Sequence, residues 1–185
     1  CLELVRFRGV EATVRLSKAT TGAVPSYMGG RMPLSAELGH FLRDKLEEAA
    51  TGQTFEDPEL AMIQPIIRLQ KERSIVPSKA QFLMEYLEDK EGYHLFVYPF
   101  EGRFVHEGIG FLWAWRLARH RASTITVSVN DYGFELLAPK TYPFEDLLDL
   151  HGDDLMEVNN LASDLELALN FSELCRRRFR AIAQV

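Results

Sequence analysis

Residues 82–99, FLMEYLEDKEGYHLFVYP, indicate the fold class of this chain. Apolar or aromatic side chains recur at every second position on both sides of a polar segment, at Phe82, Met84 and Tyr86 before it and at Leu95, Val97 and Pro99 after it. Alternation with a period of two is typical of β-strands, and the Asp89–Gly92 segment has the composition of a turn. The stretch therefore predicts a β-hairpin.

Two further pairs of strands are predicted on either side of this hairpin. Residues 2–16 alternate around Gly9, which predicts two half-buried strands joined by a turn. Residues 125–137 alternate around the segment Asn130-Asp131-Tyr132-Gly133, which predicts a hairpin of the same kind. No internal repeat and no low-complexity linker interrupts the pattern.

The remaining segments have apolar residues at helical spacing. Ser35 has the position and side chain of an N-cap for a helix that Gly52 would close. A second helix is predicted from Asp57-Pro58, with a kink at Pro65. A third, apolar on most sides, spans about 108–119 and is predicted to lie in the core. Helices follow from Pro143, with a break at His151-Gly152 and a further N-cap at Asn170 or Ser172. The predicted fold class is α+β, with antiparallel β-hairpins packed with several α-helices.

The size and composition are those of one ordinary domain. The chain has 185 residues, of which 46% are apolar and 26% charged. It contains no apolar run near the roughly 18 residues that span a bilayer, so no membrane partner is predicted. The two cysteines, Cys1 and Cys175, lie at opposite ends and favour a cytoplasmic location. Because the chain begins without Met and stops inside a helical pattern, we expect residues 1–185 to be a single domain truncated at both ends.

Charge is distributed unevenly along the sequence. The net charge is −6, yet residues 1–33 hold five basic residues against two acidic ones, a local charge of +3. Residues 141–173 hold nine acidic residues and no Lys or Arg, and four arginines then follow at Arg176, Arg177, Arg178 and Arg180. Two basic ends are compatible with a surface that attracts phosphate, while ordinary solvated faces explain the same pattern.

Motifs for catalysis are missing from the sequence. It has no phosphate-binding P-loop, no dinucleotide-binding glycine motif and no nucleophile elbow. The five histidines lack a tight metal-ligand spacing, so no metal ligand is predicted, although a site assembled only by the fold stays open. His106-Glu107 favours a structural role over an acid/base pair, because adjacent helical residues point in different directions. Cys175, beside three arginines, is predicted to be a packed helical residue.

The segment 24–35, VPSYMGGRMPLS, has the most functional character. Tyr27 offers an aromatic face for base stacking, and Gly29-Gly30 lets the backbone approach a ligand closely. Arg31 adds a positive charge, and the helix start at Ser35 offers unpaired N–H groups. These features suit a loop that contacts single-stranded nucleic acid. An ordinary connecting loop with Tyr27 packed in the core is the alternative.

Four segments in the same order give the chain a resemblance to a known family. They are VPSYMGGRMPLSAEL, GYHLFVYPFEGRFVHEG, VSVNDYGFELLAP and LCRRRFRAIAQV. Together they resemble the DEAD/H-associated region of Lhr-type helicases, most closely the ligase-associated DEXH-box helicases, over essentially the whole chain. In that family the region follows two motor domains and a winged helix, and contributes to a β-barrel and helical module that helps to hold the tracking DNA strand.

The resemblance assigns expected roles to individual positions. Tyr27 stands where the family motif has a tryptophan suited to base stacking, and an aromatic replacement keeps a smaller stacking face. The predicted nucleic-acid-binding residues are Tyr27, Gly29, Gly30, Arg31, Ser35, Arg176, Arg177 and Arg180. Further matches to the family segments, without an assigned role in binding, are Arg103, His106, Glu107, Asn130, Asp131 and Tyr132.

The resemblance implies an accessory nucleic-acid-binding domain of an ATP-dependent 3′-to-5′ DNA helicase that acts in DNA repair. No active site and no cofactor are expected within these residues, because ATP and Mg²⁺ would bind the absent motor domains. Implied partners are single-stranded DNA or an RNA:DNA hybrid, the motor and winged-helix domains in cis, and a DNA ligase or nuclease. Two alternatives are kept: a non-catalytic scaffold that docks onto the motor domains or a protein partner, and an enzyme with an unrecognised metal or His-Glu site.

Overall fold

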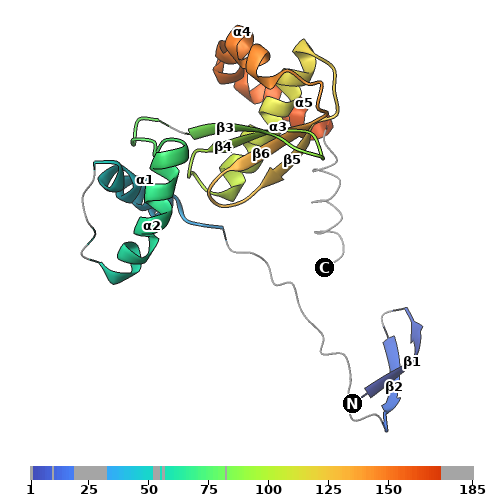
Figure 1. Ribbon diagram of the computed structural model, residues 1–185. Coiled ribbons are helices and arrows are strands. Elements are labelled where there is room, and N and C mark those ends of the chain that lie inside the picture. Colours follow the sequence, from blue (N-terminus) through green and yellow to red (C-terminus); the bar gives the residue numbers. More distant parts are fainter. Residues whose placement is uncertain are drawn as a thin grey trace. The chain divides into compact units, whose positions relative to one another are not determined.

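A computed structural model describes residues 2–9, 11–18, 33–51, 55, 57–81 and 83–171 of the chain (Figure 1). The chain divides into two compact units, Cys1–Met32 and Pro33–Val185. The prediction of one truncated domain over residues 1–185 stays a prediction, because compactness within a chain does not test whether its units fold and act together.

The first unit contains a β-hairpin. Strands β1 (Leu2–Arg8) and β2 (Glu11–Leu16) pair antiparallel, with a register irregularity between Leu4 and Arg6. Gly9 makes the turn with a φ of 62°, a backbone conformation that favours glycine. The predicted strands and turn are therefore confirmed. Their predicted half-burial is wrong within this unit, because its described large apolar side chains are between 46% and 84% exposed, namely Leu2, Leu4, Val5, Val14 and Leu16. The described strands of this unit form a single two-stranded layer, which by itself buries neither face.

The second unit is built around an antiparallel four-stranded sheet in the order β3-β4-β6-β5. The strands are β3 (Leu83–Glu88), β4 (Tyr93–Tyr98), β5 (Thr126–Val129) and β6 (Phe134–Ala138). They form the two predicted hairpins, and pairing of β4 with β6 places the hairpins side by side. Side-chain hydrogen bonds stabilise the turn between β3 and β4. Asp89 Oδ1 accepts from the N–H groups of Glu91 and Gly92, at 2.7 and 3.3 Å.

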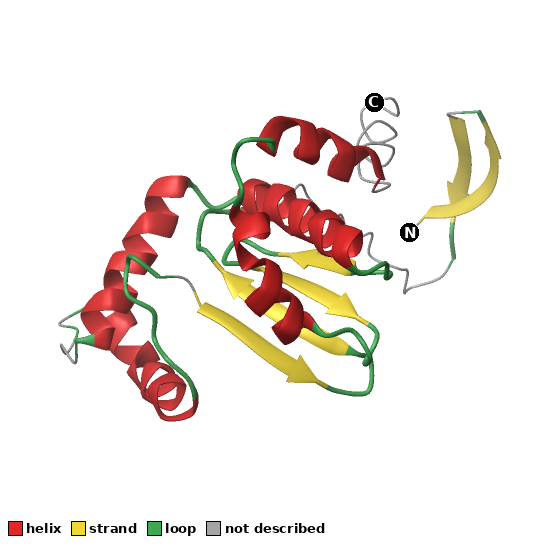
Figure 2. Cartoon of the chain, turned by 90° about the horizontal axis from the view of Figure 1, so that it is seen from above, coloured by secondary structure: helices red, strands yellow, loops and turns green. Residues whose placement is uncertain are grey.

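Three helices cover one face of this sheet (Figure 2). They are α3 (Arg103–His120), α4 (Phe144–Met156) and α5 (Leu161–Phe171). Helix α3 packs against β5, β6 and both other helices. The core between α3 and the sheet contains side chains that are at most 4% exposed, among them Leu95, Val97, Leu112, Trp113, Leu117, Phe134 and Leu136. The predicted core helix is thus confirmed, although it begins at Arg103 rather than near Gly108.

Two helices precede the sheet in the chain. Helix α1 (Ala36–Ala50) begins at Ser35, whose hydroxyl accepts from the N–H of Leu38 at 3.3 Å, as predicted for an N-cap. Helix α2 (Pro58–Arg73) is capped by Asp57 and runs through Pro65 to Arg73 as one helix. Gly52, predicted to close the first helix, lies outside the described residues.

The predicted break and N-caps of the last helices are confirmed only in part. Helix α4 is interrupted at His151, with φ −133° and ψ 16°, where the sequence predicts a break. Asn170, one of two predicted N-caps, instead lies inside α5, and the other, Ser172, lies outside the described residues. The observed fold is α+β as predicted. The six described strands form two open sheets, so the part of the chain that the structure describes closes no barrel.

Candidate nucleic-acid interface

Most of the predicted contact residues lie outside the described part of the chain. These are Tyr27, Gly29, Gly30, Arg31, Arg176, Arg177 and Arg180. Ser35 is described, and its side chain caps α1. Its hydroxyl oxygen is therefore engaged with the backbone N–H of its own helix. The other expected contacts stay predictions.

Some of the described residues in the family segments meet at one place, which we call the junction. It consists of Leu34-Ser35, Phe100–His106 and Asn130–Tyr132. The N–H of Leu34 donates to Asp131 Oδ1 at 3.1 Å across 97 positions of sequence, and the N–H of Phe100 donates to Tyr132 O at 3.1 Å. The junction therefore fixes the point at which the segment carrying Tyr27 and Arg31 leads into α1.

A strained turn shapes the middle of the junction. Phe100 has a φ of 58° and Gly102 a φ of 86°, and Phe100 is the one non-glycine residue with a positive φ among those described. Backbone in this region is costly for a residue with a side chain and persists where surrounding contacts hold it. Those contacts come from Glu101, whose carboxylate accepts from Arg43 Nη1 at 3.0 Å and lies 3.3 Å from His40 Nε2. The turn is thereby attached to α1.

His106 lies at the centre of the junction with none of its surface exposed. The N–H of Glu101 donates to Nε2 at 3.0 Å, so Nε2 must be unprotonated and Nδ1–H donates to the carbonyl of Asn130 at 2.8 Å. Burial lowers the pKa of His106, which favours this neutral form. Both ring nitrogens are used by backbone groups, which agrees with the structural role expected from the sequence.

The Asn130 turn positions two further residues of the junction. Asn130 Oδ1 accepts from the N–H groups of Tyr132 and Gly133, at 2.8 and 2.9 Å. This side-chain bonding holds Asp131 where it meets Leu34 and, at 3.7 Å, Arg103 Nη2. No described residue accepts a hydrogen bond from the buried Nε of Arg103.

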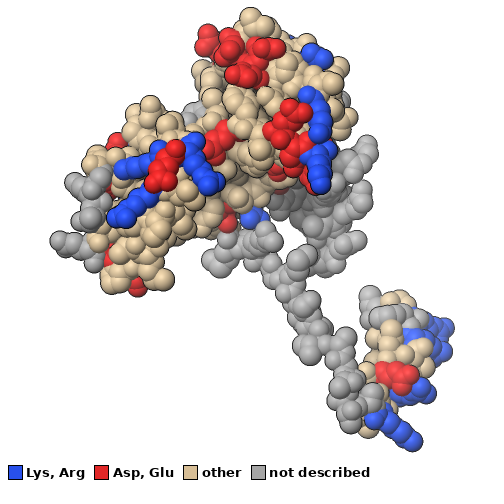
Figure 3. Space-filling model, in the orientation of Figure 1, with Lys and Arg blue, Asp and Glu red and all other residues tan. Residues whose placement is uncertain are grey.

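Exposed basic side chains gather on the β1–β2 hairpin (Figure 3). Arg6 and Arg8 are exposed on β1, and Arg15 on β2 is bound to Glu3 through two hydrogen bonds of 2.9 and 3.0 Å. With Lys18, the described part of the hairpin holds four basic and two acidic residues, a local charge of +2. Cationic side chains exposed on a strand are suited to contacts with phosphate.

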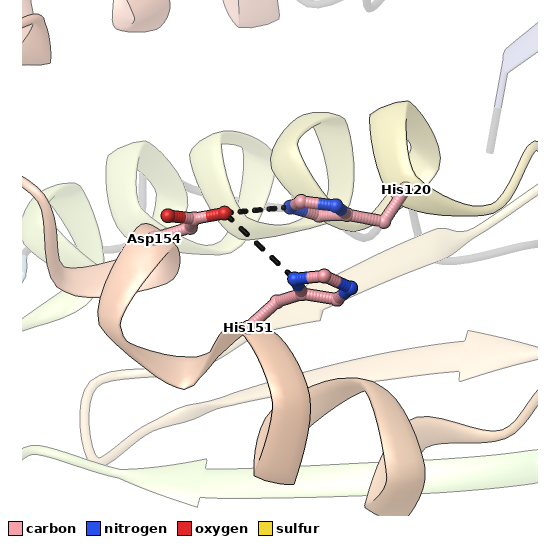
Figure 4. A group of neighbouring side chains, drawn as sticks. All are labelled: His120, His151 and Asp154. Atoms are coloured by element: carbon pink, nitrogen blue, oxygen red, sulfur yellow. Dashed lines mark ion pairs between the residues drawn. The ribbon is translucent and has the colours of Figure 1, made fainter.

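The structure also assembles a cluster that the sequence did not predict. His120 at the end of α3, and His151 and Asp154 on α4, bring their nitrogen and oxygen atoms within 4.8 Å of one another (Figure 4). His120 and Asp154 also line a hollow of about 350 Å³, together with Arg116, Arg119, Glu157, Asn160 and Asp164. The only local signal is the three-residue spacing of His151 and Asp154, because His120 comes from another helix. The prediction that no residue of the chain binds a metal stays untested.

A membrane-spanning helix is not found in the described residues, since none of their helices has the required length and apolar character.

The chain is similar to a family model and to two curated relatives. The model described as DEAD/H associated matches residues 76–185. The chain is 26% identical over 171 residues to the protein named ATP-dependent helicase Lhr-Core of Methanocaldococcus jannaschii, covering 86% of this chain and 20% of that protein. It is 23% identical over 196 residues to ATP-dependent helicase Lhr-Core protein 2 of Thermococcus barophilus, covering 98% of this chain and 22% of that protein. The chain thus spans about a fifth of the length of these relatives.

A solved structure shares the fold. The helicase Lhr of Mycobacterium smegmatis, solved bound to single-stranded DNA and AMP-PNP, superposes with a TM-score of 0.59 at 20% identity. The match covers 89% of this chain and 22% of that protein. This similarity concerns the arrangement of strands and helices.

Proposed function

The chain belongs to the DEAD/H-associated family, and from this premise we propose that it is the accessory nucleic-acid-binding region of a larger, Lhr-type ATP-dependent DNA helicase. In this role it contacts the single strand along which the motor moves. The parent translocates 3′ to 5′ and unwinds duplexes in DNA repair, in the cytoplasm. ATP and Mg²⁺ bind its motor domains, and this chain supplies no catalytic residue.

One observation carries the proposal. Segments that are far apart in the sequence, and that match the family, meet at the junction and hold the start of α1 by a hydrogen bond between Leu34 and Asp131. The 24–35 segment enters α1 at this point. A loop whose end is fixed loses less conformational freedom when it binds a ligand, so a rigid junction favours a contact loop.

In this proposal the 24–35 segment stacks on a base, and exposed arginines elsewhere in the chain attract phosphate. Tyr27 stacks on a base, with Arg31 and the Gly29-Gly30 backbone beside the phosphates. The exposed arginines of the β1–β2 hairpin, Arg6 and Arg8, add sequence-independent attraction to the backbone of the strand. Arg176, Arg177 and Arg180 extend this attraction. Either DNA or an RNA:DNA hybrid fits a contact of this kind.

The proposal is tested by fluorescence anisotropy of a labelled single-stranded oligonucleotide titrated with the 185-residue chain. Stacking of one base on an aromatic side chain contributes about 1–3 kcal/mol, so Tyr27→Ala should weaken binding by about 5- to 150-fold, and the smaller ring of a tyrosine favours the lower part of this range. Tyr86→Ala is the matched control, because Tyr86 is a 39% exposed tyrosine on β3 that lies outside the junction and that the proposal does not use. Equal affinities of wild type and Tyr27→Ala, or an equal loss in both variants, would refute the stacking role.

A second candidate function is a scaffold that docks onto the motor domains in cis or onto a ligase or nuclease. A specific observation favours it: α2 exposes Met62 by 81% and Ile66 by 68%, beside an apolar hollow of about 290 Å³. Salt separates the two functions, because phosphate contacts weaken steeply as salt rises whereas apolar docking does not. No binding to the oligonucleotide at low salt, together with salt-insensitive binding to the separately produced motor domains, would favour the scaffold.

A further inference from the structure

We propose that His120, His151 and Asp154 form a binding site for a divalent transition-metal ion of the Zn²⁺ type. Their three ligand atoms, one from each side chain, lie within 4.8 Å of one another and come from two separate helices. The site is independent of the proposed contact with nucleic acid.

The distances of both histidine nitrogens from the aspartate oxygen are close to those that a bound ion requires. Asp154 Oδ2 lies 3.1 Å from His120 Nε2 and 3.9 Å from His151 Nδ1, and both nitrogens face this oxygen (Figure 4). Bonds of about 2.1 Å at tetrahedral angles place the ligand atoms of a zinc ion about 3.4 Å apart. The two separations from Asp154 Oδ2 lie on either side of that value. Because an imidazole nitrogen binds an ion in the plane of its ring and the two rings are stacked, binding requires one of the two rings to rotate.

The fold presents the three ligands on fixed elements. His120 is the last residue of α3, and the interruption of α4 at His151 brings that ring over the ring of His120. The two rings lie 3.8 Å apart between centroids and only 11° from parallel. Asp154 follows one turn later on α4. A bound ion would therefore tie the middle of α4 to the end of α3.

The donor set selects the class of metal. Two imidazole nitrogens and one carboxylate oxygen suit Zn²⁺ and its neighbours Co²⁺ and Ni²⁺, whereas Mg²⁺ and Ca²⁺ prefer oxygen ligands alone. Three protein ligands leave a fourth position open. The side chain of Asp154 is 62% exposed, so that position is accessible to water and to the adjoining hollow.

The surrounding charges permit a cation. The hollow is lined by two arginines and three carboxylates, and the formal charge of these five side chains is −1. Arg116 is bonded to Asp164 Oδ2 at 2.7 Å, and Arg119 lies over the ring of Trp115, 4.8 Å from its centroid. Both guanidinium groups thus have partners other than the proposed ligands.

The test is titration of the metal-free 185-residue chain with Co²⁺, followed by displacement with Zn²⁺. We expect one Co²⁺ per chain, with visible absorption bands of a four- or five-coordinate ion and no intense sulfur-to-metal band. His120→Gln, His151→Gln and Asp154→Asn should each weaken binding by at least about 10-fold, the smallest loss expected for a group that belongs to a metal site. His40→Gln and Asp153→Asn are matched controls for exposed side chains of the same types and should bind like the wild type.

A second readout separates loss of the site from loss of the fold. Zn²⁺ should raise the thermal unfolding midpoint of the wild type and of both controls, because the ion binds only the folded chain. It should leave the midpoints of the three ligand variants nearly unchanged, while circular dichroism shows that these variants are folded. No stoichiometric binding would overturn the proposal. Binding that survives His151→Gln and Asp154→Asn, or that shows a strong sulfur-to-metal band from Cys1 or Cys175, would overturn it as well.

Discussion

The ion pair of Arg116 with Asp164 provides a quantitative test of how α3, α4 and α5 are held together. Arg116 Nε and Nη2 donate to Asp164 Oδ2 at 3.0 and 2.7 Å, joining α3 to α5. Arg116 Nη1 donates to the carbonyls of Asp154 and Leu155 at the end of α4, at 3.0 and 2.8 Å. One guanidinium therefore connects three helices.

The structure allows the cost of breaking this pair to be estimated. The side chains of Arg116 and Asp164 are 4% and 13% exposed. Removing one partner of a buried ion pair costs about 3–5 kcal/mol, because a charge is left without compensation. The cost of Asp164→Leu should be near the lower end of this range, at about 3 kcal/mol. Arg116 would keep its bonds to both carbonyls, and it lines the adjoining hollow. Arg116→Met should lower the free energy of unfolding by a similar amount. It leaves the Asp164 carboxylate and the carbonyls of Asp154 and Leu155 without their donor.

A double-mutant cycle isolates the interaction itself. The free energy of unfolding is measured by urea denaturation for the wild type, Arg116→Met, Asp164→Leu and the double variant. Because the double variant has no unpaired charge, its loss should be smaller than the sum of the single losses by about 1–3 kcal/mol. Single losses below about 1 kcal/mol, or strictly additive losses, would refute the account of Arg116 as a buried and coupled link.

Three further predictions concern the scaffold of the junction and the sheet. Gly133→Ala should lower the free energy of unfolding by at least about 1–3 kcal/mol in urea, because a Cβ there would collide with the backbone carbonyl of Val97, and a wild-type midpoint would contradict this. Ser35→Ala should cost about 0.5–1 kcal/mol through loss of the helix cap, and the same assay would show an unchanged stability if the hydroxyl bond did not matter. His94 bonds to Glu135 Oε1 and to an Asp89 oxygen, at 2.6 and 2.9 Å, and these bonds raise its pKa. The stability it adds is therefore fully present below its unfolded pKa of about 6.5 and is lost as pH rises through the folded pKa. His94→Gln should remove this part of the pH dependence of unfolding, and an unaltered pH profile in the variant would count against it.

The sequence predicted those elements whose signals are local. Alternation around Gly9, the Asp89 turn and the Asn130 turn correctly predicted three hairpins, and Ser35 and Asp57 correctly predicted two helix starts. In each case short-range hydrogen bonds or backbone preferences determine the structure, so one sequence contains the necessary information.

Elements without such local signals were predicted less well. The start of α3 was placed about five residues late, because Gly102 begins the helix with no side-chain cap. Asn170 was considered as a cap, yet it lies within α5, whose packing on α3 outweighs the weak helix propensity of asparagine. The His120, His151 and Asp154 cluster depends on the packing of α3 against α4, so the spacing of His151 and Asp154 alone could not predict it.

The central claim, that this chain contacts the nucleic-acid strand, is tested most directly by the salt dependence of binding. Anisotropy titrations over a range of salt concentrations would compare the wild type with Arg6→Gln/Arg8→Gln on the hairpin and with the control Lys140→Gln, an exposed cation outside it. Each phosphate contact contributes about 0.7 to the slope of log affinity against log salt for a single strand, so the double variant should reduce the slope by about 1.4. Lys140→Gln should leave the slope unchanged. If the wild type did not bind at low salt, or if all three proteins had the same slope, the claim that this chain contacts the strand through the hairpin would be contradicted.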